Sequence, residues 1–343
     1  MKPEAGLAYR PELDALRAVA VGLVLFSHFW FNDSGLGHVG VRLFFVLSGF
    51  LITTILLEGG SAAGFYVRRI FRLAPALYLA LALALLLDLD GMRATWKWHF
   101  LQITNILLAR LDSWSPIWPA DHLWTLNVEE QFYLVWPLVI GLTPRRLLPT
   151  AFAVLIVMAP AFRIAGHVLG WGEVATLVLP PASFDALGFG GLMAVLNLRL
   201  GRWTLLCSPG LLAVAINPFP SSFWLKEFAE LASLPVLGAL VRAGWDGRLG
   251  LRHRPLVAIG RISYGVYLYH GFVFGLVALW GLSERGPLLM IVATVITFAV
   301  AALSYATVER PVRAMGRRIA TRLETLKGAN AVRSREGGDA GLV

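Results

Sequence analysis

Residues 39–57 read VGVRLFFVLSGFLITTILL, an apolar run in which Arg42 carries the only charge. A helix of this length rises about 28 Å, which is close to the thickness of a bilayer's hydrocarbon core. Similar runs recur along the chain between short joints that carry arginine. Of the 343 residues, 57% are hydrophobic and 15% are charged, and the mean hydropathy is +0.68. Because a soluble domain has roughly 25% charged residues, we predict an all-α polytopic membrane protein.

About ten transmembrane helices are predicted, two of them short for a full crossing. The predicted stretches are 13–31, 39–57, 72–89, 126–143, 148–168, 176–197, 203–217, 225–242, 257–281 and 286–306. With the N-terminus inside, 22 lysines and arginines fall on the cytoplasmic side and six on the other. This imbalance favours cytoplasmic placement of both termini. We expect a membrane domain over 1–313 and a basic, disordered cytoplasmic tail over 314–343.

The formal net charge of +9 would suggest a nucleic-acid partner in a soluble protein. In a membrane protein the same excess anchors cytoplasmic loops, so no nucleic-acid partner is expected. The single cysteine, Cys207, excludes an internal disulfide and a cysteine-based metal cluster. We read it as a small packing residue.

A polar stripe follows the first predicted span, LDALRAVAVGLVLFSH at 13–28. Arg17 and His28 differ by only about 20° around the helix and lie about 16 Å apart along it. Asp14 is within reach of Arg17 at i,i+3. Arg17 could simply extend to the cytoplasmic surface while His28 bonds to a neighbouring helix. Polar groups along a span are otherwise costly, and they indicate a pathway or an active site.

Further polar residues fall within predicted spans. Asp185 lies among glycines, Glu129 and Glu130 lie at the outer end of the fourth span, and Tyr264 and His270 lie along the ninth. For each residue alone, a structural hydrogen bond is an adequate explanation. Together they indicate a polar interior cavity.

Three arginines, Arg68, Arg69 and Arg72, precede Pro75 on the predicted inner side. Because Arg69 and Arg72 are spaced i,i+3, both guanidinium groups can reach one anion, and their planar geometry suits phosphate. The alternative is that these arginines are only topology signals.

Taken in order, these motifs resemble the acyltransferase-3 family of integral membrane O-acyltransferases, which includes bacterial O-antigen and exopolysaccharide O-acetylases. The resemblance covers about residues 9–313. It depends on seven features: Arg17 with His28, GVRLFFVLSGFLI at 40–52, Arg69 with Arg72, HLWTLNVEEQFYL at 122–134, Asp185 in its glycine-rich span, ISYGVYLYH at 262–270, and SYATVERP at 304–311 with Glu309. Many relatives have Asp where Arg42 stands, and Tyr305 replaces a phenylalanine.

The resemblance implies transfer of an acyl group, usually acetyl, from cytoplasmic acyl-coenzyme A to a hydroxyl of a glycan or another surface molecule. It implies donor binding by Arg17, Arg69 and Arg72, with Arg68 beside them. His28 is the expected general base, and Asp185, Glu129 or Glu130 could orient it. The supporting residues are expected to be Asp14, Tyr264, His270 and Glu309. Neither a metal nor a permanently bound cofactor is expected.

Some members carry a soluble C-terminal domain, but this sequence ends soon after Glu309, so we expect catalysis in the membrane part. The expected location is the bacterial plasma membrane. A transporter with a polar intramembrane pathway is the main alternative, and a silent scaffold is a third. The acceptor, the acyl length, a covalent acyl-enzyme, the carboxylate that partners His28 and the oligomeric state stay open.

Overall fold

The computed structural model describes residues 9–31, 34–59, 61–114, 120–217, 222–279 and 286–339, which form helices and connecting loops with no β-strand among them. Each of the ten predicted spans overlaps one of the helices in the structure. These helices are α1 (Pro11–Phe29), α2 (Leu36–Leu57), α3 (Ala62–Leu86), α6 (Leu123–Leu142), α7 (Leu148–Val168), α9 (Phe184–Leu196), α10 (Ser208–Ile216), α11 (Phe223–Trp245), α12 (Arg254–Leu279) and α13 (Pro287–Ser304). The others are α4 (Met92–Phe100), α5 (Thr104–Leu111), α8 (Ala175–Val178) and α14 (Arg310–Asp339). The last two residues of the predicted stretch 257–281 lie outside the described residues.

The all-helical prediction is confirmed for the described residues, and the chain is a multi-pass membrane protein. Within the described ranges, four helical stretches could cross a membrane by length and composition: Leu36–Leu57, Ala62–Leu86, Arg145–Val168 and Pro287–Thr325. The sixth predicted span is divided, because Pro180 and Pro181 separate α8 from α9. With 13 residues, α9 rises only about 20 Å. The count of ten crossings therefore stays a prediction.

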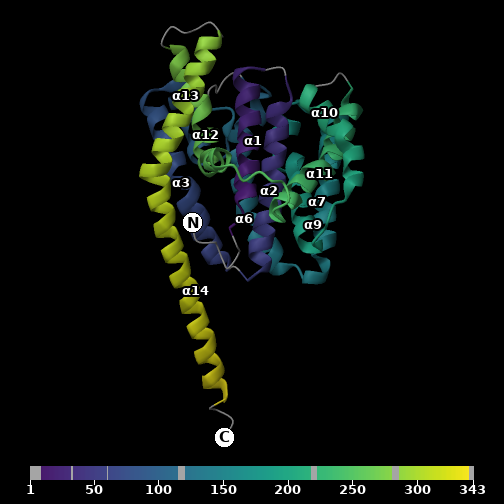
Figure 1. Ribbon diagram of the computed structural model, residues 1–343, viewed down its shortest axis with the longest axis vertical. Helices are drawn as coiled ribbons and strands as arrows, with labels where there is room; N and C mark the ends of the chain where they lie inside the picture. Colours follow the sequence, from purple (N-terminus) through teal and green to yellow (C-terminus); the bar gives the residue numbers. More distant parts are fainter. Residues whose placement is uncertain are drawn as a thin grey trace.

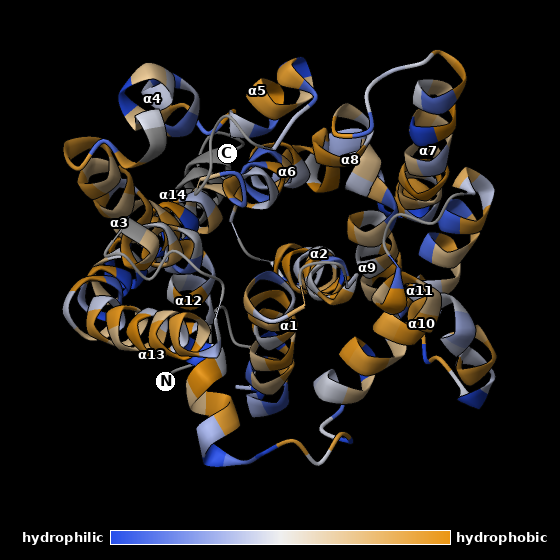
Figure 2. Ribbon diagram, turned by 90° about the horizontal axis from the view of Figure 1, so that it is seen from above, coloured by the Kyte–Doolittle hydropathy of each residue, from blue (hydrophilic) through white to orange (hydrophobic). Residues whose placement is uncertain are grey.

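Helices α1 and α2 occupy the centre of the molecule, with two groups of helices beside them (Figures 1 and 2). On one side α12 packs on α1, α13 packs on α12, and α14 packs on α3. On the other side α9 packs on α2, α7 packs on α9, and α10 packs on α11. Any site formed between the two groups therefore has α1 or α2 in its wall.

Close approach of neighbouring helices to the central helices α1 and α2 depends on glycine. A Cβ at Gly190 of α9 would collide with the backbone carbonyl of Val46, and one at Gly49 of α2 would collide with that of Leu187. Likewise, a Cβ at Gly260 of α12 would collide with the backbone of Asp14. These contacts bring the helix backbones together as small residues do in membrane bundles.

The outer faces of the bundle are apolar, as Figure 2 shows for α3, α7 and α13. The exposed side chains there include Leu83 of α3, Val157 of α7 and Val295 of α13. Exposed apolar surface of this extent is typical of a protein that faces lipid.

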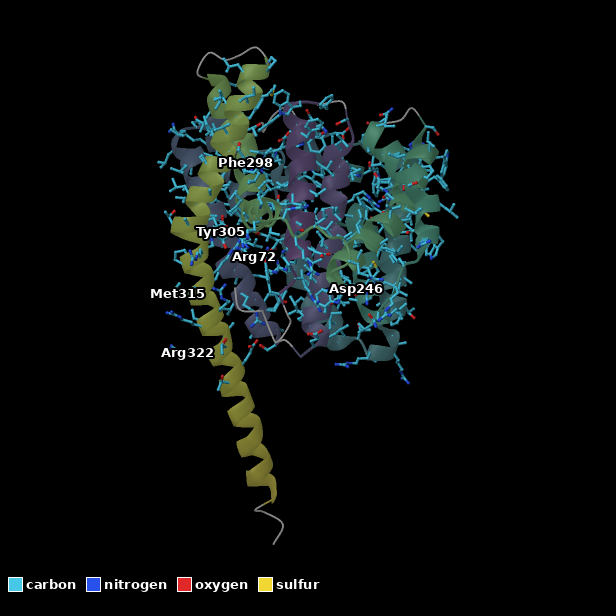
Figure 3. The ribbon with its side chains drawn as sticks, viewed as in Figure 1. Arg72, Asp246, Phe298, Tyr305, Met315 and Arg322 are labelled. Carbon is cyan, nitrogen blue, oxygen red and sulfur yellow. The ribbon has the colours of Figure 1, made fainter. Side chains whose placement is uncertain are left out.

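The last two helices form one continuous rod in Figure 3, where Phe298, Tyr305, Met315 and Arg322 mark its course. A π-helical turn, Tyr305–Glu309, joins α13 to α14, and such turns are frequent at functional sites. Helix α14 continues as far as Asp339, and the expected disorder of the tail over 314–343 stays a prediction. Residues 340–343 lie outside the described residues.

Replacing Gly190 with alanine should destabilise the protein, because the new methyl group meets the backbone of α2 and not a movable side chain. Overpacking of this kind costs about 1–3 kcal/mol. Gly22→Ala is the matched control, since a Cβ there has no neighbour within 4 Å. Thermal unfolding in detergent should show a clear loss for Gly190→Ala and none for the control. Equal stability of the two variants would contradict the packing described for α2 and α9.

Candidate active site

A cavity opens between α1, α2, α3, α6 and α12, and five of the predicted site residues line it. Its empty volume is about 690 Å³ including its open mouth, and the five are Arg17, Arg69, Arg72, Glu129 and Tyr264. We call this the central cavity. Its remaining lining is largely apolar side chains of α2, with Leu73 of α3 and Leu126 of α6. The structure thus brings together residues that are up to 247 positions apart in the chain.

A second, strongly basic cavity adjoins the first, because Arg17 and Arg72 line both, and its empty volume including its open mouth is about 500 Å³. We call it the basic cavity. It is lined by Asp14 and Gly260, and by the arginines Arg17, Arg68, Arg72, Arg261, Arg313 and Arg317. In Figure 3, Arg72 lies on α3 between α14 and the central helices. Even with Glu309 and Glu324, which pair with Arg313 and Arg68, the six guanidinium groups outnumber the carboxylates, and this positive excess suits an anion.

Several of these arginines are held by fixed partners. Arg17 donates to Asp14 at 2.7 Å, Arg68 donates to Glu324 at 2.8 Å, and Arg313 donates to Glu309 at 2.7 Å. Asp14 and Glu309 were both predicted as supporting residues, and these contacts place them beside the arginines of the basic cavity.

Three other guanidinium nitrogens of the arginines that line the basic cavity lack a hydrogen-bond partner. Buried Nη2 of Arg68, Nε of Arg72 and Nε of Arg313 have no hydrogen-bond acceptor. Buried donors are normally satisfied, so three unsatisfied guanidinium nitrogens beside one cavity call for an explanation. A bound anion with several oxygens would supply the missing acceptors.

The two predicted glutamates of α6 occupy different places. Glu129 accepts hydrogen bonds from Ser48 at 2.7 Å and from Tyr133 at 3.0 Å, and it lines the central cavity. Glu130 is not among the residues that line it. Arg69 lies over the ring of Tyr133 at 4.3 Å, a cation–π contact that fixes the guanidinium at the cavity wall.

Three histidine rings meet beside the central cavity. Nδ1 of His28 lies 2.9 Å from Nε2 of His270, and the ring of His122 lies 4.5 Å from that of His270. Two of the predicted site residues, His28 of α1 and His270 of α12, are therefore in contact. His28 is exposed, whereas His122 and His270 are buried.

One pair of side chains separates the histidines from the central cavity. Tyr267 and Thr125 both line the cavity, and their hydroxyl groups are 2.5 Å apart. The ring of Tyr267 also packs against His270 at 5.4 Å and His122 at 5.8 Å. The histidine cluster is therefore one side-chain layer away from the cavity.

Asp185 lies in a separate ion network and not beside the histidines. Its carboxylate accepts from Arg42 at 3.2 Å and from Arg163 at 3.2 Å. Arg163 also donates to Glu227 at 2.9 Å, and Arg42 pairs with Glu230 at 2.7 Å. These five side chains come from α2, α7, α9 and α11, and all are buried.

Comparison with known proteins decides the family. Residues 10–306 match a family model described as an acyltransferase domain. The chain belongs to this acyltransferase family.

Similar relatives cover nearly all of the chain. YrhL of Bacillus subtilis, assigned as a peptidoglycan O-acetyltransferase, is 31% identical over 90% of this chain. The peptidoglycan O-acetyltransferase OatA of Listeria monocytogenes is 28% identical, and the O-acetyltransferase OatA of Staphylococcus aureus is 25% identical, each over 90% of this chain. The chain spans only 55% to 58% of the length of these relatives. No solved structure matches it.

Within this acyltransferase domain, sequence reasoning missed two features. His122 stands at the start of the quoted motif HLWTLNVEEQFYL but was not singled out. Arg42 was noted only as a charge in an apolar run and as a departure from relatives, and Arg163 was not singled out. The available signal was that a charge inside an apolar stretch needs a partner, so two such arginines predict acidic neighbours.

Arg163→Met should destabilise the protein strongly, because it leaves Asp185 and Glu227 buried without their shared cation. Removing one partner of a buried ion pair costs about 3–5 kcal/mol. Arg93→Met is the control, since Arg93 is exposed and its pair with Asp88 is worth about 0–1 kcal/mol. Adding Glu227→Gln to Arg163→Met should recover part of the loss. Equal unfolding temperatures for the two single variants would argue against the network.

Proposed function

We propose that the chain is a membrane O-acetyltransferase that moves an acetyl group from acetyl-coenzyme A to a hydroxyl group of a cell-surface glycan. Family membership and relatives that are O-acetyltransferases support the reaction class. The names of two relatives support peptidoglycan as the glycan. The observation that carries the proposal is the basic cavity with its unsatisfied buried guanidinium nitrogens.

The chemistry of coenzyme A fits the two adjoining cavities. Its phosphates would bind in the basic cavity, where the free donor atoms of Arg68, Arg72 and Arg313 lie. Its long, less polar arm would follow the central cavity, whose lining is largely apolar. The thioester would then lie near Thr125 and Tyr267, next to the histidines.

His28 acts as the general base in this proposal. It takes the proton of the acceptor hydroxyl as that oxygen forms a bond to the acetyl carbonyl carbon. The carbon–sulfur bond breaks, and the thiolate of coenzyme A receives a proton from the imidazolium. An acetyl ester and a free thiol result, and His28 returns to its neutral form.

The membrane topology that accompanies this proposal has ten crossings in the bacterial plasma membrane with both termini in the cytoplasm. Charge bias supports this orientation. The start of α1 and the start of α14 lie on the same side of the bundle, since Asp14 and Arg317 line one cavity. The donor site then faces the cytoplasm.

Thiol release tests the function directly. Purified protein given acetyl-coenzyme A and a glycan acceptor should release free coenzyme A, and mass spectrometry should find the acetyl ester on the acceptor. A transporter would release no thiol, and that result would overturn the proposal.

Arg72→Ala should weaken acetyl-coenzyme A binding by roughly 10- to 150-fold, because one charge-assisted contact is worth about 1.5–3 kcal/mol. Arg72→Lys should keep part of the affinity, since lysine retains the charge without the planar donor geometry. Arg145→Ala is the control, because it removes an exposed arginine that lines neither cavity. Calorimetry would measure the donor affinity. Unchanged affinity in Arg72→Ala, or an equal loss in the control, would leave Arg72 as a topology signal only.

A further inference from the structure

Both ring nitrogens of His270 have close partners. Its Nδ1 lies 2.5 Å from the backbone carbonyl oxygen of Tyr267, one turn earlier in α12. Its Nε2 lies 2.9 Å from Nδ1 of His28 in α1. His270 is buried, so these two contacts lie away from bulk water.

The carbonyl partner decides where the proton of His270 resides. A carbonyl oxygen can only accept a hydrogen bond, so Nδ1 of His270 carries the proton. In a neutral imidazole the other nitrogen, Nε2, is then an acceptor. It follows that the contact between the two rings is made by a proton on Nδ1 of His28.

We propose that His270 is a positioning residue that fixes His28 in the tautomer whose lone pair is on Nε2. The inference rests on the proposed function, because it names the atom of His28 that accepts the hydroxyl proton. The chain of contacts runs from the Tyr267 carbonyl through His270 to His28. Since Tyr267 also lines the central cavity, the same residue borders the donor path and orients the base.

The direction of Nε2 fits this role. A Cβ added at Gly37, in the first turn of α2, would lie 3.7 Å from Nε2 of His28. This nitrogen therefore faces the beginning of α2, and the His28 side chain is exposed there. A glycine at this position places no side chain against Nε2, and the acceptor hydroxyl would approach His28 from the end of the bundle opposite the basic cavity.

The surrounding rings hold His270 without competing for its nitrogens. His122 meets it edge-on, with an interplanar angle of 60°, and Nε2 of His122 lies 3.1 Å from the Leu268 carbonyl oxygen. Phe29 packs on His270 at 6.2 Å between ring centres. The ring of His270 is thus fixed by packing as well as by its hydrogen bonds.

A neutral partner has a specific advantage at this position. When His28 takes the hydroxyl proton, its Nδ1–H still donates to Nε2 of His270, and the bond becomes charge-assisted. A carboxylate would stabilise the imidazolium more, but it would also place a permanent charge in an apolar setting. His270 orients the base without that cost.

Two variants of His270 separate hydrogen bonding from packing. Glutamine keeps a side-chain carbonyl that can accept from His28, whereas phenylalanine keeps an aromatic ring but no acceptor. We expect His270→Gln to retain turnover within about tenfold. His270→Phe should lower kcat by about 10²-fold or more while the KM for acetyl-coenzyme A changes little, since general-base catalysis contributes about 10²–10⁴-fold. His167→Phe and His167→Gln are matched controls, because His167 is exposed and stacks on Phe223, away from the site.

Nitrogen-15 NMR of histidine-labelled protein gives a readout that needs no turnover. The chain has seven histidines, so single substitutions can assign the His28 signals. The wild type should show His28 protonated on Nδ1 and unprotonated on Nε2, and His270→Phe should show a mixture of tautomers. A proton on Nε2 of wild-type His28, or turnover by the Phe variant equal to that of the Gln variant, would overturn the inference. If the wild type transfers no acetyl group, the proposed function fails while the NMR result still decides the tautomer.

Discussion

An ionised side chain in an apolar interior must be paired, and this constraint organises both halves of the molecule. Around Asp185, Arg42 and Arg163 pair with three buried carboxylates, those of Asp185, Glu227 and Glu230. That network joins helices from separate parts of the chain. Because the paired side chains belong to α2, α7, α9 and α11, the ion pairs stabilise one arrangement of these four helices.

The other half of the molecule has the opposite balance of charge. Around the basic cavity, arginines outnumber carboxylates, and buried nitrogens of Arg68, Arg72 and Arg313 have no acceptor. Such an arrangement is costly for the protein alone, and a bound anion would offset the cost. The Asp185 network has more carboxylates than arginines, whereas the basic cavity has more arginines than carboxylates, and this difference favours the basic cavity as the anion site. Asp185 lies in that network and not beside the histidines, and its predicted role as the partner of His28 stays a prediction.

Much of the site could be predicted from sequence because its residues are polar or charged side chains within apolar stretches. Arg17, Arg69 and Arg72 stand out as charges in apolar stretches, and helical periodicity already places Arg17 and His28 on one face. The contact between His28 and His270 could not be predicted in detail, because it depends on how α1 and α12 are rotated against each other. The partners of Asp185 are 22 and 143 positions away, so no local pattern indicates them. For the fold, helix positions were predictable from apolar runs, whereas the shortening of α9 follows from a proline pair that the hydropathy pattern hides.

The central claim is that His28 accepts the proton of the acceptor hydroxyl, and His28→Gln tests it most directly. Glutamine preserves approximate size and hydrogen bonding but cannot act as a base at neutral pH. The measurement is acetyl transfer from acetyl-coenzyme A by the purified variant, with donor affinity measured alongside. The account predicts turnover lower by about 10²–10⁴-fold and donor affinity close to that of the wild type. Near-normal transfer by His28→Gln would contradict it and leave His28 as a structural hydrogen-bonding residue.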